Sequence, residues 1–254
     1  MGHQSKHRAI DSEYSKKIEK YLYSKTDEKI IASKMLRDIF SGKMFKNVLD
    51  VGAGPGDLSA TLADMAEKLT LVEIVSEYEA VLRKRFPDAR VIVDTIDNVY
   101  LAAEYDFIFL SHVLYYFPEK EWFGLVKRLH EALIPGGNLV IVMMNDTGDW
   151  WKIINNYWRP LRKYIRFDYI PLPIFKEGLA KIGPVETYPF TNKVIFDSKD
   201  ALIDCIGEEI LQINDANVLE KFRGNFIEFA SIFNRPNGEI SLCCDSEIIV
   251  MSRS

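Results

Sequence analysis

Between residues 47 and 144, short apolar runs alternate with longer polar stretches that have helical spacing. This pattern predicts buried strands joined by crossover helices, as in an open α/β fold built on a parallel sheet. Five strands are expected, at residues 47–51, 69–74, 90–93, 105–110 and 138–144. The intervening helices are expected at 58–68, 76–86 and 118–133, and Pro135-Gly136-Gly137 is expected to end the last one in a tight turn.

The flanking segments add helices and two more strands. Two amphipathic helices are predicted before the core, at 12–23 and 27–40, and they form an N-terminal cap. After the core the pattern predicts a helix at 172–182, a strand at 185–196, helices at 198–213 and 217–233, and a long strand at 239–252. We expect a single domain over 1–254, with a cap (1–44), a ligand-binding core (45–145) and a region of lid, helical insertion and last strands (146–254).

Composition narrows the class of protein. The net charge of −5 argues against general affinity for nucleic acid or an anionic membrane, and the longest apolar run, 139–144, is too short to span a bilayer. Three cysteines without C-x-x-C spacing suggest neither disulfides nor a zinc site. We therefore expect a cytoplasmic protein with no metal and no membrane partner, and the sequence leaves open whether it is a monomer or a homodimer.

Three glycines at alternate positions follow the first predicted strand. They are Gly52, Gly54 and Gly56, and Asp50 precedes them within the strand. A turn without side chains lets a ligand lie close to the backbone. The spacing differs from the G-x-G-x-x-G that holds a pyrophosphate, so the motif predicts a nucleotide-like ligand without one. Asp50 is expected either to hold the turn or to contact the ligand.

Acidic residues end the next two predicted strands. Glu73 lies 73 − 56 = 17 residues after the last glycine, where a carboxylate can accept hydrogen bonds from both hydroxyls of a ribose. Asp94 and Thr95 end the third strand, and the acid there can accept from an exocyclic adenine amine. An adenosine group fits all three positions.

These motifs resemble the class I S-adenosylmethionine-dependent methyltransferases over about residues 45–145. The resemblance is carried by D-V-G-A-G-P-G-D at 50–57, Glu73, Asp94 and Y-D-F-I-F-L-S at 105–111. It implies a doubly wound, Rossmann-like α/β fold whose seven-stranded, mostly parallel sheet has one antiparallel strand. It also implies S-adenosyl-L-methionine as cofactor and S-adenosyl-L-homocysteine as product, with no metal.

A wider resemblance links the flanks to the histamine N-methyltransferase family. It is carried by S-H-V-L-Y-Y at 111–116, by 148–157, by Thr26-Asp27-Glu28 and by Tyr14. It implies cofactor contacts at Gly52, Glu73, Tyr78 and Ser111, and amine contacts at Asp27 or Glu28, at His112 and near Cys244. Tyr14, Trp150 and Tyr157 are expected as further substrate contacts. Two of the three amine positions differ in residue type from the family, so a small amine other than histamine is expected.

The resulting hypothesis is methyl transfer to a nitrogen of a small amine or imidazole-like substrate. Asp27 and Glu28 are expected to attract a cationic amine, and His112 to accept a proton or a hydrogen bond from the reacting group. An O-methyltransferase with His112 as general base uses the same residues. An RNA or protein methyltransferase stays open, because aromatic and basic residues interleave at 150–168. A nucleotide-dependent oxidoreductase and a regulatory cofactor-binding protein are further alternatives.

Overall fold

A seven-stranded sheet organises the chain in a computed structural model that describes residues 25–158, 170–210, 213 and 215–254. Its order is β3-β2-β1-β4-β5-β7-β6, and only the pairings of β7, with β5 and with β6, are antiparallel among the described strands. The doubly wound, mostly parallel fold class is confirmed. The strands are β1 (Phe45–Val51), β2 (Ala66–Glu73), β3 (Arg90–Val93), β4 (Tyr105–Ser111), β5 (Leu133–Thr147), β6 (Val185–Phe196) and β7 (Ile240–Ser252).

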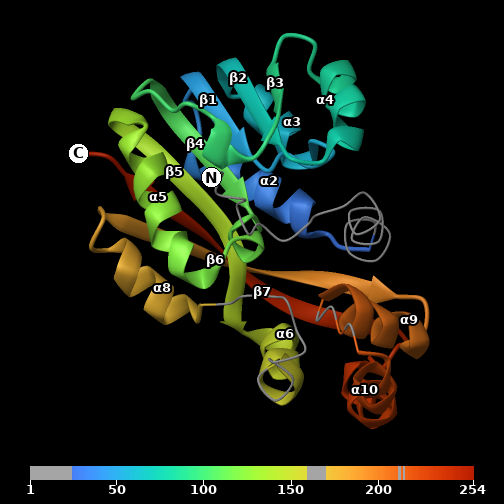
Figure 1. Cartoon of the computed structure of the whole chain (residues 1–254). Helices are drawn as coiled ribbons and strands as arrows, with labels where there is room; N and C mark the ends of the chain where they lie inside the picture. Colours follow the sequence, from blue (N-terminus) through green and yellow to red (C-terminus); the bar gives the residue numbers. More distant parts are fainter. Residues whose placement is uncertain (1–24, 159–169, 211–212, 214) are drawn as a thin grey trace, which may run out of the picture.

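Alternating side chains bury both faces of this sheet, as expected where helices cover each face. On β4, Phe107 and Phe109 join one hydrophobic cluster, whereas Ile108 and Leu110 join the other. The first cluster is covered by α2 (Glu28–Ile39), α3 (Asp57–Ala63) and α4 (Glu79–Arg85), and the second by α5 (Trp122–Glu131) and α8 (Leu172–Leu179) (Figure 1). Short 3₁₀ turns are η2 (Ser76–Tyr78), η3 (Ile96–Asn98), η4 (Leu114–Tyr116) and η5 (Glu119–Glu121).

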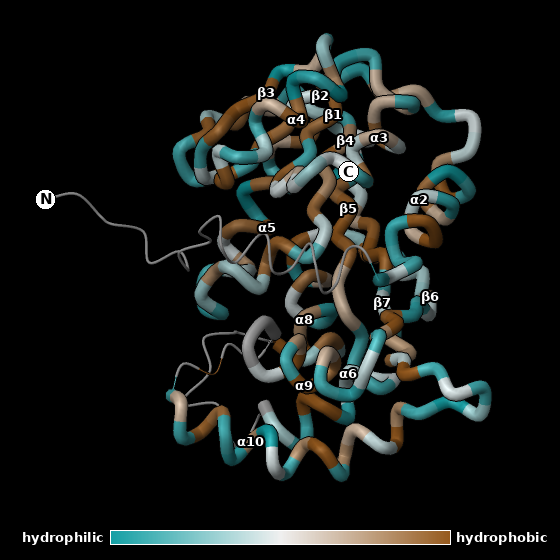
Figure 2. The backbone as a smooth tube through the Cα atoms, turned by 90° about the vertical axis from the view of Figure 1, so that its right-hand side faces the viewer, coloured by the Kyte–Doolittle hydropathy of each residue, from teal (hydrophilic) through white to brown (hydrophobic). Residues whose placement is uncertain are grey.

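The predicted helical insertion lies between β6 and β7, at the end of the molecule away from β1 to β4 (Figure 1). Its elements are α9 (Lys199–Asp204), η8 (Cys205–Ile210), α10 (Ala216–Phe229) and η9 (Ala230–Phe233), and α6 (Gly148–Ile153) with η6 (Ile154–Trp158) lies close to them. Figure 2 shows hydrophobic segments along the strands and mixed character along α10. None of the helices in the described ranges is both long enough and apolar enough to cross a membrane.

Several boundaries differ from the sequence expectation, and two of the differences have a clear cause. The helix expected at 58–68 ends at Ala63, because β2 begins at Ala66 and pairs with β1 from its first residue. The turn expected at Pro135-Gly136-Gly137 lies inside β5 as an irregularity in its pairing with β4. Gly136 adopts a φ of 80°, and its N–H donates to the Arg253 carbonyl at 2.7 Å, so the segment is held by the C-terminal end of β7.

The expected helix at 12–23, Tyr14 and residues 159–168 of the expected lid lie outside the described residues. The second helix of the expected cap is present as α2, and the lid region is described as far as η6. The two helices of the insertion and the strands on either side of it occur where the sequence pattern predicts them.

A buried acid fixes α6 to β7. Asp149 is 5% exposed and accepts hydrogen bonds from Arg235 Nη2 at 2.6 Å, Lys152 Nζ at 2.8 Å and the Cys243 N–H at 2.8 Å. Burial alone would raise the pKa of Asp149, but these three donors outweigh it and lower the pKa. The Asp149 carboxylate therefore sets the position of the helix that carries Trp150.

We expect Asp149→Ala to lower the free energy of unfolding by about 2 to 3 kcal/mol, because it leaves the partly buried Arg235 and the Cys243 N–H without their acceptor. Lys152→Met is the matched control, since the Lys152 side chain is 55% exposed, and its removal should change stability by less than about 1 kcal/mol. Urea unfolding of both variants measures this. Equal effects would show that Asp149 does not anchor α6.

Candidate active site

The glycine turn after β1 is shaped by packing at its two ends. Gly52, Gly54 and Gly56 all have positive φ, at 75°, 55° and 89°. A Cβ on Gly52 would lie 2.5 Å from Val113 Cγ2, and one on Gly56 would lie 2.6 Å from Phe86 Cε2. Around Gly54 nothing in the described structure comes within 4 Å of such an atom. The middle of the turn therefore presents bare backbone to open space.

That open space is a pocket of about 370 Å³, part of it open to solvent. The turn forms one wall, with Asp50 and Asp57 at its two ends, and Ser111 at the end of β4 forms another. Lys29 reaches the pocket from α2. The pocket lies at the carboxyl ends of β1 and β4, where open α/β sheets bind ligands.

Glu73 ends β2 next to the turn. It is 6% exposed, and its two carboxylate oxygens accept from different backbone groups, the Gly54 N–H at 2.7 Å and the Val75 N–H at 2.8 Å. Burial raises the pKa of Glu73, although these N–H donors oppose the shift. Each oxygen retains a second lone pair, so the carboxylate can accept the two hydroxyls of a ribose while it stays fixed to the backbone.

The other predicted cofactor residues lie along the same edge. Asp94 follows β3, which pairs with β2 so that Glu73 is opposite Val93. The Asp94 Oδ1 accepts from the Thr95 N–H at 2.7 Å and from Asn98 Nδ2 at 2.8 Å, and the Thr95 hydroxyl accepts from the Asp97 N–H. Tyr78 in η2 packs against the cluster under α3 and α4. The edge therefore fits an adenosine group that carries a polar tail.

Asp50 is a buried acid below the turn. It is 2% exposed, and its Oδ2 accepts from the Ser59 hydroxyl at 2.6 Å. Burial raises the pKa of Asp50 to about 7; Glu73 adds to the shift, whereas Ser59 and Lys29 oppose it. Asp50 holds the turn to α3 through Ser59 and also faces the pocket, so both expectations for this residue have a structural basis.

Glu28 and His112 form a pair that the sequence placed 84 residues apart. Their Oε1 and Nε2 atoms are 2.5 Å apart, at the start of α2 and just after β4. Burial would raise the pKa of Glu28, but the charges and hydrogen bonds of His112 and Lys29 lower it to about 2. His112 has a φ of 56°, a strained value for a residue with a side chain, and its N–H donates to the Val142 carbonyl at 2.9 Å.

Asp27 does not join this pair. Its carboxylate accepts from the Lys193 N–H at 2.7 Å, which ties the start of α2 to β6. Thr26 makes the adjacent contact, because its hydroxyl accepts from Asn192 Nδ2 and from the Glu28 N–H, both at 3.1 Å. Of the two acids expected to attract a cationic amine, Glu28 thus meets His112, whereas Asp27 anchors the helix.

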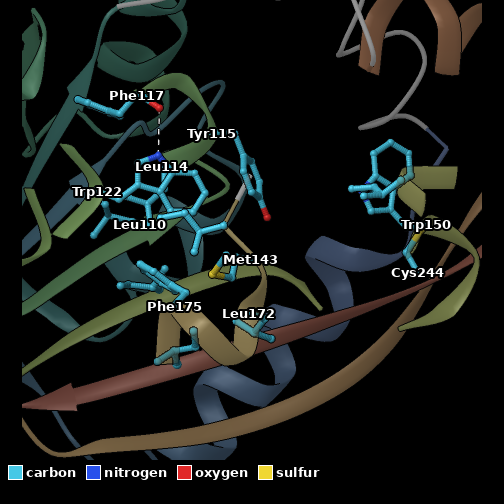
Figure 3. Packing of buried hydrophobic residues seen from close by; sticks show 14 of the residues in the cluster. Leu110, Leu114, Tyr115, Phe117, Trp122, Met143, Trp150, Leu172, Phe175 and Cys244 are labelled. Carbon is cyan, nitrogen blue, oxygen red and sulfur yellow. Dashed lines mark hydrogen bonds between the residues drawn. The ribbon is translucent and has the colours of Figure 1, made fainter. Parts of the chain in front are cut away.

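Two of the further predicted substrate residues, Cys244 and Trp150, lie on this side of the site together with Tyr115. Tyr115 stacks on His112 with 5.8 Å between ring centroids, and burial, with the nearby charge of Glu28 adding, raises the pKa of both Tyr115 and Cys244. Figure 3 shows Trp150 and Cys244 beside each other and Tyr115 at the margin of the packed leucines and aromatics. Trp150 Nε1 is buried with no hydrogen-bond partner among the described residues. Tyr157 does not join them, because its ring packs on Phe222, Phe226 and Phe229 of α10.

Two residues that matter for this geometry were not singled out by their sequence pattern. Asn192 lies 166 residues from Thr26 in sequence, and its Nδ2 donates to the Thr26 hydroxyl that in turn accepts from the Glu28 N–H. Lys29 is a charged residue on an amphipathic helix, which is typical of a solvated face, yet its side chain is only 20% exposed.

Comparison with known proteins shows what the core is similar to. Residues 48–137 match the family model of the methyltransferase domain. Nodulation protein S of Azorhizobium caulinodans is 34% identical over 102 residues, which are 39% of this chain and 45% of that protein. The chain thus matches less than half the length of this curated relative.

Solved structures share the fold. A putative methyltransferase from Bacillus halodurans superimposes with a TM-score of 0.64 at 17% identity, covering 87% of this chain and 98% of that one. The N-methyltransferase NodS of Bradyrhizobium japonicum, crystallised with S-adenosyl-L-homocysteine, gives 0.53 at 14% identity, covering 89% and 87%. These relatives support the class I methyltransferase resemblance; they do not support the closer one to histamine N-methyltransferases.

The raised pKa of Asp50 predicts a pH-dependent stability. In the unfolded chain Asp50 loses its proton as the pH rises above its ordinary pKa of 3.8, whereas in the folded chain it keeps the proton up to a pH of about 7. The free energy of unfolding therefore falls as the pH rises over that range. Asp50→Asn removes the ionisation. The difference in free energy of unfolding between Asp50→Asn and the unmodified protein should therefore shift in favour of the variant between about pH 4 and pH 7, by at most about 4 kcal/mol. Chemical unfolding at several pH values measures it; a constant difference would contradict the assignment.

Proposed function

The chain carries an S-adenosylmethionine-dependent methyltransferase domain of the class I fold, and we propose that it transfers the methyl group to a nitrogen of a small amine. The observation that carries this proposal is the ionised, buried carboxylate of Glu28 held 2.5 Å from His112 at the ligand-binding edge of the sheet. A buried negative charge favours a cationic partner, and aliphatic amines are cationic at neutral pH. The similarity to an N-methyltransferase in a Bradyrhizobium species supports nitrogen as the acceptor.

The cofactor would lie along the edge formed by β1, β2, β3 and β4. Glu73 would accept the ribose hydroxyls, and Asp94, Thr95 and Tyr78 would surround the adenine. The backbone of Gly52, Gly54 and Gly56, with Asp50 and Ser111, would receive the amino-acid end. When bound, the cofactor supplies a methyl group on a positively charged sulfur, which leaves as a neutral thioether, so alignment and a neutral nucleophile are what the protein must add.

The Glu28 and His112 pair can provide that neutral nucleophile. Because Nε2 faces Glu28, a neutral His112 that donates there has its unprotonated nitrogen at Nδ1. Nδ1 is the atom that would take a proton from the ammonium of the substrate, and the Glu28 carboxylate would stabilise the resulting imidazolium. The nitrogen freed in this way would be able to accept the methyl group that the bound cofactor supplies, and the methylated amine would carry the positive charge that leaves the sulfur.

Three aromatic or apolar side chains would hold the acceptor. Burial keeps the Cys244 thiol neutral, so Trp150, Tyr115 and Cys244 would offer mostly apolar surfaces near the charged pair. The indole N–H of Trp150 lacks a hydrogen-bond acceptor among the described residues. An amine that also carries a hydrogen-bond acceptor would satisfy it, since buried donors are nearly always paired.

A methyl-transfer assay with labelled S-adenosylmethionine tests the proposal against its alternatives. Small amines, phenols and alcohols, total RNA and a protein mixture are offered separately. The proposal predicts transfer to amines. Transfer restricted to hydroxyl compounds would identify an O-methyltransferase that uses His112 as base, transfer to macromolecules would overturn the small-molecule assignment, and cofactor binding without transfer to any acceptor would indicate a regulatory protein.

Variants of the pair separate substrate selection from proton transfer. Glu28→Gln removes the buried charge, so we expect the KM for the amine to rise by about tenfold or more. His112→Gln keeps a hydrogen-bonding side chain but cannot take up a proton at neutral pH, so kcat should fall and its pH dependence should change. Asp27→Asn is the matched control for Glu28→Gln, because Asp27 contacts β6 and not His112.

The outcomes of these kinetics are distinct. Full activity with an unchanged pH profile in His112→Gln would limit His112 to positioning the substrate. A KM effect in Asp27→Asn as large as in Glu28→Gln would show that the start of α2 acts as a structural unit and that Glu28 has no special contact with the amine.

The ribose assignment is tested by binding. Glu73→Ala should weaken S-adenosyl-L-homocysteine by more than about tenfold, because it removes two charge-assisted hydrogen bonds of roughly 1.5 to 3 kcal/mol each. The affinity of the unmodified protein for S-adenosyl-L-homocysteine should fall as the pH falls and Glu73 takes up a proton. Because the pKa of Glu73 is raised, this loss of affinity should begin at a higher pH than it would for an ordinary glutamate. Calorimetry measures both, with Glu77→Gln in the exposed η2 turn as the control. Unchanged affinity in a folded Glu73→Ala variant would refute the assignment.

A further inference from the structure

Lys29 is a charged residue of α2 that the proposed chemistry leaves without a role. Its side chain is 20% exposed and lines the pocket together with the glycine turn. Its Nζ lies 3.3 Å from the Ser111 hydroxyl, to which it donates, and 3.7 Å from Glu28 Oε1. The ammonium group is therefore directed toward the sheet edge.

The charges of the pocket suit a zwitterion. Asp50 supplies an acidic group that can face an ammonium, whereas Asp57 is paired with Arg85 at 3.0 Å. Among the described residues that line the pocket, Lys29 supplies the cation. A carboxylate bound beside the turn without a positive partner would lose much of its hydration without compensation. The amino-acid end of the proposed cofactor carries one ammonium and one carboxylate, so it matches both halves of this arrangement.

We propose that Lys29 binds the carboxylate of the cofactor's amino-acid end, an inference that rests on the proposed function. α2 then contributes to both halves of the site from two consecutive residues, Glu28 toward the acceptor and Lys29 toward the cofactor. Asp27 and Thr26 fix this turn of α2 to β6 through the Lys193 N–H and Asn192, so the two charges are placed together. Recognition of the amino-acid end thus depends on a helix that precedes the cofactor motif in sequence.

The test removes the carboxylate from the ligand and the charge from the protein in turn. Calorimetry compares S-adenosylmethionine with decarboxylated S-adenosylmethionine, which keeps the ammonium, on the full chain and on Lys29→Met. The parent should bind the decarboxylated compound about tenfold or more weakly, and Lys29→Met should lose this preference. Lys29→Arg should retain most of it. Lys34→Met, which removes an exposed lysine of the same helix that pairs with Asp38, should behave as the parent does.

Each result decides one assignment. A parent protein that prefers neither compound, or a Lys29→Met variant that keeps the full preference, overturns the role of Lys29 while leaving the proposed function in place. Equal weakening of both ligands in Lys29→Met also overturns it, because the loss would then not depend on the carboxylate. Absence of binding of either compound to the parent overturns the proposed function and this inference together. If Lys29→Met does not fold, Lys29→Gln, which also removes the charge, takes its place with the same expected loss of preference.

Discussion

A buried ionised carboxylate at the sheet edge constrains how the whole site is assembled. Glu28 is 8% exposed and keeps its charge because His112 and Lys29 approach it. Such a charge is stable only when its partners are held in place. His112 is held in a left-handed backbone conformation by β4 and β5, and α2 is held by its contacts with β6. The contact between Glu28 and His112 thereby links β4, in the middle of the sheet, to α2 and through it to β6 at the sheet's edge.

This constraint explains why polar groups of different elements meet beside the glycine turn. The turn and Glu73 come from neighbouring parallel strands, and their shared hydrogen bond through the Gly54 N–H keeps the Glu73 carboxylate in register with the turn. α6 closes the opposite side, where Asp149 anchors it to β7 and places Trp150 next to Cys244. The proposed site therefore combines a cofactor edge with an acceptor region built from α2, η4, α6 and β7.

Local patterns in the sequence were enough to predict the sheet and the glycine turn that follows its first strand. Strand burial produces apolar runs, and a close turn requires glycine, so both leave a signal within a few neighbouring residues. The end of α3 and the irregular start of β5 were misplaced, because Ala66 and Gly136 take their conformation from pairing with distant strands. The same limit applies to the acid pair at 27–28. Which of two adjacent acids meets His112 depends on α2 docking to β6, and no local pattern encodes that contact.

In the proposed site the acceptor nitrogen lies against Glu28 and His112, next to a cofactor held along β1, β2 and β4. A crystal structure of the protein with S-adenosyl-L-homocysteine and an amine that it methylates is the decisive measurement. We expect the amine nitrogen within hydrogen-bond distance of the Glu28 and His112 pair, with the ribose on Glu73. An amine bound elsewhere, with the pair unchanged and in contact with neither ligand, would contradict it.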